Sequence, residues 1–526
     1  MCYNESMKKK PEATEMITIP RVEYEALLEK NEELTKQVKW LMEQLRLLTH
    51  RAYGASSEKT DPKQLSWFNE VEMEANELIA EPKMTEIEKH FRKKAKSSMT
   101  KLPPNIPVEI IEHRLPKSEQ ICPECTGDLH VMGKVSRKEL KIVPAKATIV
   151  EHVQYTYACR CCEKAAFGVP IIKAPIDRPV IKGSFASPEI IAYIISQKFV
   201  MGMPLYRLEQ ELNRNGISLP RQTMSNWLLK STEDYLMPIY ETLHKILSER
   251  QILHADETVL QVLKEPGKTP QSKSYMWLFR TSGDTDEPIV LYNYQADRKA
   301  KRAETFLSGF SGYLHTDGYS GYHNLAKEIT VVGCFAHARR KWVEALKSLP
   351  EKDRKNASAQ RGKIYCDRLF ALERDWKDLS SDERYQKRQE LAKPIVDELF
   401  AWLKSIKTAP KTAFGKAVAY HLNQQQYLEN YLLDGRLEIS NNRAERAIKP
   451  FVIGRKNFLF ANTPRGARAS AIMYSIVETA KENGLIPFEY LAHIFKHAPN
   501  CDIRNNIDSL QSLLPWNVPS HCKLPR

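Results

Sequence analysis

The chain has 526 residues, a length that predicts several domains rather than one. Lys and Arg number 79 against 65 Asp and Glu, so the net charge of +14 favours a polyanionic partner, nucleic acid before anionic membrane. A hydrophobic content of 42% excludes a disordered chain. The densest apolar run, Ile190–Ile195, is far shorter than the ~18 residues of a membrane span, and the opening residues have no apolar core, so we expect a cytoplasmic protein.

A heptad repeat predicts a coiled coil over residues 1–52. The a positions hold Tyr24, Asn31, Val38 and Leu45, and the d positions hold Leu27, Leu34, Leu41 and Leu48. Because Asn at an a position favours a parallel pair in one register, we expect a leucine-zipper-like homodimer or a higher assembly. The alternative is one amphipathic helix packed on its own protein. Residues 53–115, charged and then Pro-rich, are expected to form a partly helical linker.

Two Cys-x-x-Cys pairs, separated by 33 residues, predict a structural zinc ribbon over residues 116–175. A tetrahedral Zn²⁺ bound by four thiolates has no open position, so we expect a role in folding or docking rather than in catalysis. Cys161 is the alternative fourth ligand. The expected ligands are Cys122, Cys125, Cys159 and Cys162.

Residues 185–245 change to helical periodicity and predict a helix-turn-helix. One helix stops at Gly216, and a short polar helix begins at Arg221 after an Ile-Ser-Leu-Pro segment. The second helix of such a motif places polar side chains in the major groove of DNA. An ordinary helical hairpin is the alternative. The candidate DNA contacts are Arg221, Gln222, Thr223, Ser225 and Asn226.

Strand periodicity dominates from residue 251 to residue 335. Three strands, a helix, a strand, a helix and a further strand are the element order of a ribonuclease H-like α/β domain. We expect this domain over residues 250–480, with a helical insertion at about 337–434 and a C-terminal extension over 481–526. An independent helical domain without a catalytic role is the alternative for the insertion. The expected fold class is therefore multidomain α+β.

Two aspartates lie on strands of this expected sheet. Asp256 interrupts an otherwise apolar strand, and Asp317 precedes a glycine at a strand end. Because the first and fourth strands can be neighbours, the two carboxylates can meet and bind a hard cation. A simple turn is the ordinary explanation of Asp317 taken alone. Glu257 rivals Asp256, but strand alternation points it to the opposite face; His254 shares the face of Asp256.

A third carboxylate lies in a basic segment that begins a helix at Ser440 or Asn441. Between residues 436 and 468 there are eight basic residues and two acidic ones, Glu438 and Glu445. Such a composition is expected if Glu445 binds a metal ion while its neighbours bind phosphates. His337, followed by two arginines, is expected to contact backbone phosphate or to lie on a solvated basic face. The candidate phosphate contacts on the helix are Arg443, Arg446, Lys449, Arg455 and Lys456.

Four motifs resemble the insertion-sequence-66 family of bacterial transposases. They are His254-Ala-Asp-Glu-Thr258, His315-Thr-Asp-Gly-Tyr319, Gly333-Cys-Phe-Ala-His-Ala-Arg-Arg340 and Ser440-Asn-Asn-Arg-Ala-Glu-Arg-Ala447. The heptads, the four cysteines and the closing Leu-Pro-Trp-Asn agree with this resemblance. It implies that Asp256, Asp317 and Glu445 are a catalytic Asp-Asp-Glu triad. It also implies a bacterial, nucleoid-associated protein helped by small accessory proteins of the same element.

The clustered acids predict metal-dependent chemistry, because three carboxylates repel one another unless cations neutralise them. We therefore expect two Mg²⁺ or Mn²⁺ ions, which can serve hydrolysis of a phosphodiester and its transfer to a 3′-hydroxyl. The hypothesis is a DNA transposase that binds double-stranded DNA, both element ends and target, and cleaves and joins its strands. The alternatives are a zinc-containing DNA-binding regulator, a domesticated inactive remnant, and a structure-specific nuclease without strand transfer.

Overall fold

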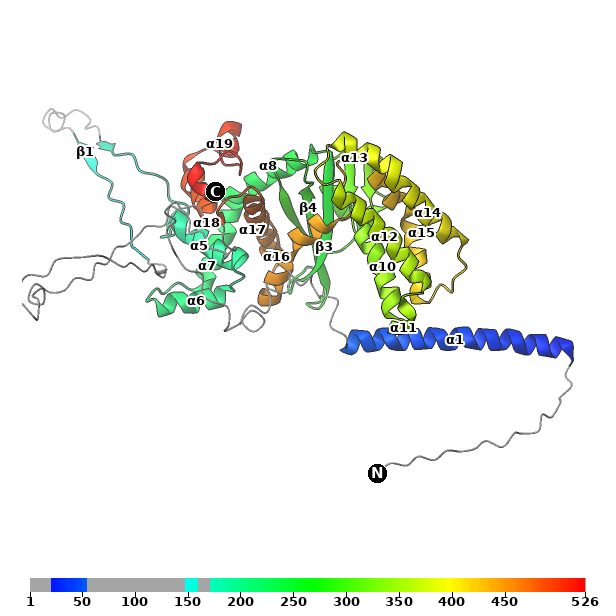
Figure 1. Ribbon diagram of the computed structural model, residues 1–526. Helices are drawn as coiled ribbons and strands as arrows, with labels where there is room; N and C mark the ends of the chain where they lie inside the picture. The colour runs from blue at the N-terminus through cyan, green and yellow to red at the C-terminus, as the bar shows by residue number, and fades with distance from the viewer. Residues whose placement is uncertain (1–19, 54–146, 159–170, 526) are drawn as a thin grey trace, which may run out of the picture. The chain divides into compact units, whose positions relative to one another are not determined.

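The computed structural model describes residues 20–53, 147–158 and 171–525 (Figure 1). The chain divides into two units, one of residues 1–55 with 177–524 and the other of residues 56–176 with the last two residues. The protein is therefore multidomain, and because both helices and sheets are present it is mixed in class. Among the described residues, no helix is both long enough and apolar enough to cross a membrane.

The N-terminal helix α1 (Arg21–Tyr53) covers the predicted heptads in 33 continuous residues. The a and d side chains that the structure describes here are exposed, and each of its large apolar members is more than half exposed to solvent. These members are Tyr24, Leu27, Leu34, Val38 and Leu41. The apolar seam of α1 is therefore accessible to a second chain, as the coiled-coil prediction requires.

The second unit contains a small antiparallel ribbon of β1 (Thr156–Ala158) and β2 (Ile171–Lys173). The Gln154 side chain extends the pairing, because its Nε2 donates to the Ala174 carbonyl at 2.6 Å. The four predicted zinc ligands, Cys122, Cys125, Cys159 and Cys162, lie outside the described residues, as do residues 54–115 of the predicted linker over residues 53–115.

Helices form the segment between residues 188 and 248, as the sequence predicts. Ser187 caps the first of them, since its Oγ accepts the Ile190 N–H at 3.2 Å, and Gly216 ends α6 with a φ of +77°. The helices α6 and α7 contact each other, and Leu212 and Trp227 are buried while Arg221 is exposed. The helices are α5 (Pro188–Ile195), η2 (Ser196–Val200), α6 (Leu205–Arg214), α7 (Arg221–Ser231), η3 (Thr232–Leu236) and α8 (Met237–Ser248).

The main sheet has five strands in the order β5-β4-β3-β6-β7. The first three along the chain are antiparallel, whereas β6 runs parallel to β3 and β7 parallel to β6. The first and fourth strands, β3 and β6, are paired, as the sequence predicts. The expected helix between β6 and β7 is only the 3₁₀ turn η4 (Ser320–Tyr322). The strands are β3 (Ile252–Gln261), β4 (Lys273–Thr281), β5 (Val290–Gln295), β6 (Gly312–His315) and β7 (Ile329–Val332), with α9 (Ala300–Phe306) before β6.

Residues 335–432 form a helical insertion around a hydrophobic core of their own. This core reaches the main sheet through Ile252 and Val332, and the Gly333 N–H donates to the Tyr427 carbonyl at 2.8 Å. The insertion is therefore packed on the β7 edge of the sheet. Its helices are α10 (Phe335–Lys347), α11 (Glu351–Arg354), α12 (Ser358–Asp375), α13 (Ser381–Lys387), η5 (Arg388–Ala392), α14 (Lys393–Ser405), α15 (Ala413–Glu429) and η6 (Asn430–Leu432).

Helices after the insertion return to the sheet. The long helix α16 contacts β3, and α17 packs along β5 (Figure 1). The segment after residue 481 shares this core, because Leu491, Phe495 and Leu514 are buried in it. The elements are α16 (Asn442–Phe458), α17 (Pro464–Glu482), α18 (Pro487–His497), η7 (Ala498–Asn500), α19 (Ile507–Gln511) and η8 (Ser520–Cys522).

Candidate active site

The three predicted acids lie near one end of the β3–β6 pair, close enough for their charges to act on one another. The parallel register aligns His254 with His315, so Asp256 and Asp317 each lie two residues beyond an aligned histidine. Glu445 lies in the first turn of α16, the helix that contacts β3. The negative charges of Asp317 and Glu445 both act on Asp256 and raise the pKa of its carboxyl.

Asp256 is a buried carboxyl whose negative charge, when ionised, the protein does not compensate. Burial raises the pKa of Asp256 well above its ordinary value, and the charge of Glu257 is the next cause. Its carboxylate accepts the Glu257 N–H at 2.8 Å, but within the described chain neither Asp256 nor Asp317 has an ion-pair partner. A group of acids kept together in this way needs a cation from outside the protein.

Glu257, the neighbour of Asp256 in sequence, is neutralised by the fold itself. Its side chain is only 1% exposed, forms an ion pair with Arg298, and accepts the Tyr322 hydroxyl at 2.6 Å. The Arg298 guanidinium in turn lies 3.7 Å from the centre of the Tyr319 ring. Strand alternation therefore places the two adjacent carboxylates in different surroundings. Glu257 is paired with Arg298, whereas Asp256 has no cation beside it in the part of the chain that the structure describes.

Two buried histidines form a layer behind the acids. The rings of His254 and His315 stack with centroids 4.3 Å apart and an interplanar angle of 8°. Burial lowers the pKa of His254 to about 3, and burial together with His254 lowers the pKa of His315 well below its ordinary value. Both rings are therefore neutral at neutral pH, so they add no positive charge beside the acids.

Asn441 joins the start of α16 to the strand of Asp256. It stands at the N-cap position, but its side chain does not cap the helix. Its Oδ1 lies 2.9 Å from His254 Nδ1 and its Nδ2 donates to the Ala255 carbonyl at 2.8 Å. These fully buried contacts hold the first turn of α16, and with it Glu445, against β3.

Cys334 and His337 face Glu445 from the start of α10. One ligand atom from each of the three lies within 4.8 Å of the others. His337 Nδ1 is 3.5 Å from Glu445 Oε1, and both atoms are buried without a hydrogen-bond partner. Arg340 approaches the other oxygen at 3.8 Å. Burial raises the pKa of the Cys334 thiol to about 11, so His337 and Glu445 are the better metal ligands of the three.

The five basic candidates on α16 divide into two groups. Arg443 Nε donates to Glu438 at 2.7 Å, and Arg455 donates to the Thr258 hydroxyl at 3.1 Å and to the Val259 carbonyl. These two guanidinium groups are engaged within the protein. The side chains of Arg446 and Lys456 are exposed and that of Lys449 is half-buried, so by exposure Arg446 and Lys456 are the most accessible of the five.

Comparison with known families shows which family the chain belongs to. Residues 183–469 match the family described as Transposase IS66 family. The chain belongs to the IS66 transposase family. Residues 119–163 match the zinc-finger binding domain of transposase IS66, a range that includes all four predicted zinc ligands. Residues 475–516 match the IS66 C-terminal element, and residues 40–111 match Transposase C of IS166 homeodomain.

Relatives of this IS66 transposase occur in Sinorhizobium fredii. The uncharacterized protein y4jD is 28% identical over 516 residues, which are 94% of this chain and 97% of the relative. The uncharacterized protein y4qI is 31% identical over 431 residues, which are 78% of this chain and 75% of the relative. The similarity therefore extends over most of the molecule rather than over one motif.

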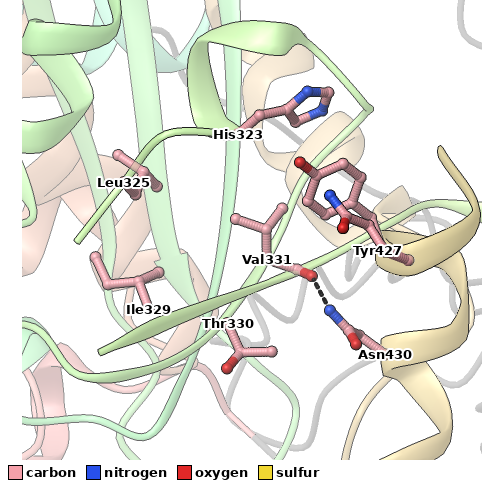
Figure 2. A pocket seen from close by; sticks show the side chains of 8 residues that line it. His323, Leu325, Ile329, Thr330, Val331, Tyr427 and Asn430 are labelled. Carbon is pink, nitrogen blue, oxygen red and sulfur yellow. Dashed lines mark hydrogen bonds between the residues drawn. The ribbon is translucent and has the colours of Figure 1, made fainter. Parts of the chain in front are cut away.

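A cavity of about 300 Å³ lies between β7 and α15 of this transposase (Figure 2). The His323 ring stacks on Tyr427 with centroids 4.2 Å apart, and Asn430 Nδ2 donates to the Val331 carbonyl at 2.8 Å. None of the three acids lines the cavity. The cavity is therefore separate from the cluster of acids.

Sequence reasoning missed two of the residues that surround the acids of this transposase. His337 was expected to bind phosphate or solvent, but it is mostly buried and faces Glu445. Asn441 was expected only as a possible cap. The Cys-x-x-His spacing of Cys334 and His337 was a signal in the sequence, whereas nothing local to Asn441 indicates that it binds β3.

Proposed function

We propose that the protein cleaves phosphodiester bonds at the ends of its element and joins the freed 3′-hydroxyl to target DNA. The observation that carries the proposal is the proximity of Asp256, Asp317 and Glu445, of which Asp256 and Asp317 have no ion-pair partner among the described residues and Glu445 has only the distant Arg340 at 3.8 Å and His337 at 3.5 Å. The family match agrees with DNA transposition. The strand order β5-β4-β3-β6-β7, with three antiparallel strands followed by two parallel ones, supports a ribonuclease H-like catalytic domain.

The three acids would hold two Mg²⁺ or Mn²⁺ ions, because carboxylate oxygens are the preferred ligands of hard cations. When bound, the ions would activate the attacking hydroxyl and stabilise the leaving oxygen of an in-line displacement. Asn441 positions Glu445 by tying α16 to β3. His337, neutral because burial lowers its pKa, presents its Nδ1 lone pair or proton to the Glu445 carboxylate.

DNA would lie along the positive surface beside these acids. On α16, Arg446, Lys449 and Lys456 would neutralise backbone phosphates. On α7, the polar side of the helix would contact base edges through residues such as Arg221, Gln222 and Asn226, which are exposed. Phosphate contacts position a protein on the duplex and base contacts supply specificity, so we assign end recognition to α7 and not to α16.

Two parts of the chain would organise the complex rather than catalyse. The four-cysteine ribbon would hold one structural Zn²⁺ through Cys122, Cys125, Cys159 and Cys162, in agreement with the zinc-finger match. The exposed seam of α1 would pair two copies in parallel. Deleting residues 1–50 should then lower the mass measured by light scattering, and an unchanged mass would reject this dimer contact. Small accessory proteins of the element and a nucleoid location belong to the same proposal.

A matched pair of variants tests the catalytic proposal. Asp256→Asn should abolish cleavage and joining of a duplex that carries the element's own end, in Mg²⁺, while the melting temperature stays equal or rises. Glu257→Gln, at the adjacent position, should lower the melting temperature because it removes the ion pair with Arg298, yet folded protein should still cleave.

The alternatives give different results in the same assay. Near-normal cleavage by Asp256→Asn would refute the assignment of this residue. Wild-type protein that binds the end but does not cut it would favour an inactive remnant or a regulator. Cutting without joining would favour a structure-specific nuclease, because joining alone requires the 3′-hydroxyl to act as the nucleophile.

A further inference from the structure

The C-terminal segment folds back onto the turn between α17 and α18. The Ile486 N–H donates to the Cys522 carbonyl at 2.8 Å, and the Leu524 N–H donates to the Gly484 carbonyl at 2.8 Å. An isolated bridge between Leu485 and Lys523 completes the pairing. Residues 520–524 are thus held beside α18 by the backbone, independently of their side chains.

This fold-back brings together donor atoms that soft metal ions prefer. His493 of α18, His521 and Cys522 each offer one ligand atom, and the three atoms lie within 4.8 Å of one another. His497 follows His493 by four residues, so both imidazoles lie on one face of α18, with ring centroids 4.3 Å apart. His493 and His521 have ring centroids 5.9 Å apart.

The donor set discriminates between classes of metal. Imidazole and thiolate ligands suit Zn²⁺ and similar first-row ions, whereas Mg²⁺ and Ca²⁺ require oxygen ligands. Zinc binds nitrogen at about 2.0–2.1 Å and thiolate at about 2.3 Å, so the ligand atoms of one tetrahedral ion are roughly 3.5 Å apart. Small side-chain rotations would bring the three atoms from their present spacing to this one.

The Cys522 thiol has one weak hydrogen bond that a metal ion could replace. This thiol donates to the Glu489 carbonyl at 3.7 Å. A metal ion would replace that single proton, and the nearby positive charge of Lys496 opposes binding only weakly because Lys496 is exposed.

We propose that His493, His521 and Cys522, with His497 as the fourth ligand, bind one Zn²⁺ per chain. This site is separate from the predicted four-cysteine ribbon and from the acids of the active site. It fastens the C-terminal segment to α18, whose apolar face packs against α5 in the main core. The proposal does not depend on the catalytic proposal, because it concerns a different cluster and a different class of metal.

Zinc content of the full-length protein tests this site. His521→Ala should lower the zinc measured by elemental analysis by one equivalent per chain relative to wild type, and Cys522→Ser should do the same. Because His521 is exposed and Cys522 is buried, the His521 variant is the one expected to fold without difficulty. The matched control is Cys501→Ser, an exposed free cysteine outside the cluster, which should keep the wild-type content. Wild-type zinc in the His521→Ala protein would overturn the proposal.

The absorption spectrum of bound Co²⁺ tests which residues are ligands, whereas elemental analysis tests only how many metal ions are bound. Protein loaded with Co²⁺ should give a difference spectrum, wild type minus Cys522→Ser, with strong tetrahedral d–d bands and a thiolate-to-cobalt band. The absorption of Co²⁺ bound to the four-cysteine ribbon cancels in this difference spectrum, since both proteins contain those four cysteines. A featureless difference spectrum would show that Cys522 binds no metal and would overturn the proposal. Cys159→Ser should remove one further equivalent of zinc, which separates the two sites.

Discussion

The helical insertion and the acidic edge of the sheet both bury charge, but they treat it in opposite ways. Arg388 in the insertion is completely buried and forms two bonds of 2.8 and 2.7 Å to the Glu373 carboxylate. It also donates to the backbone carbonyls of Tyr431, Asp434 and Leu437. At the acidic edge, Asp256 and Asp317 have no such partner among the described residues.

The difference separates structural charge from functional charge. A buried ion whose hydrogen-bonding groups are all used can only hold the fold together, and removing one partner is costly. A group of acids without a cation lowers stability until an ion arrives, so such a group is retained for what it binds. Four predictions test this contrast, from the largest expected effect to the smallest.

Glu445→Gln should abolish strand cleavage and joining in Mg²⁺. Substitution of groups that only support metal ligands costs about 10–100-fold, so loss of a ligand should cost more than about a hundredfold. Folding and DNA binding should persist, since one repulsive charge is removed. The measurement is cleavage of an element-end duplex beside a binding assay. The control is Glu438→Gln, similarly exposed but paired with Arg443, which should keep most activity; equal losses in both variants would contradict the assignment.

Arg388→Met should lower the free energy of unfolding by about 3–5 kcal/mol, because Glu373 would remain buried without its cation. Urea denaturation followed by tryptophan fluorescence measures this change. The matched surface pair is Arg368 with Glu398, whose groups are 4.0 Å apart and more than half exposed. Arg368→Met should cost at most about 1 kcal/mol. A similar cost for both variants would mean that burial does not decide the value of these pairs.

Acid should weaken the insertion through His421. This buried ring contacts the Ala417 carbonyl at 2.8 Å, and burial lowers its pKa to about 4. The unfolded chain binds a proton near pH ~6.5 while the folded chain stays neutral, so stability is lost as pH falls from ~6.5 toward ~4. By pH ~5 the free energy of unfolding should fall by about 2 kcal/mol more in wild type than in His421→Leu. Urea titrations of both proteins at neutral pH and at pH ~5 test this. The same fall in the free energy of unfolding in wild type and in His421→Leu would refute it.

Arg446→Gln should weaken DNA binding only slightly. If Arg446 contacts one phosphate, the slope of log affinity against log salt should become shallower by about 1, with no change in melting temperature. Arg443→Gln is the comparison, because Arg443 is already bonded to Glu438. It should leave the salt slope unchanged and lower the melting temperature. The opposite pattern would exchange the roles of these two arginines.

Much of the candidate site could be proposed from the sequence because its signals are local. An aspartate within an apolar strand, an aspartate at a strand end and a glutamate in a basic helix are each unusual in their own few residues. Strand and helix periodicity also placed the elements that carry them. The helix expected between β6 and β7 was wrong, since only a 3₁₀ turn forms in the short segment around Tyr319, whose backbone N–H is taken by the Asp317 carboxylate at 3.0 Å.

The amino-acid sequence by itself determined the family and most of the elements, and it singled out the three candidate acids, since periodicity and residue chemistry are properties of neighbouring positions. Only the tertiary structure decided which charges are compensated. Arg298 neutralises Glu257 across 41 residues, and Asn441 reaches His254 across 187. The fold-back that joins Cys522 to His493 is of the same kind. Such pairs depend on how distant elements pack, and packing follows from the burial of the whole core rather than from any local pattern.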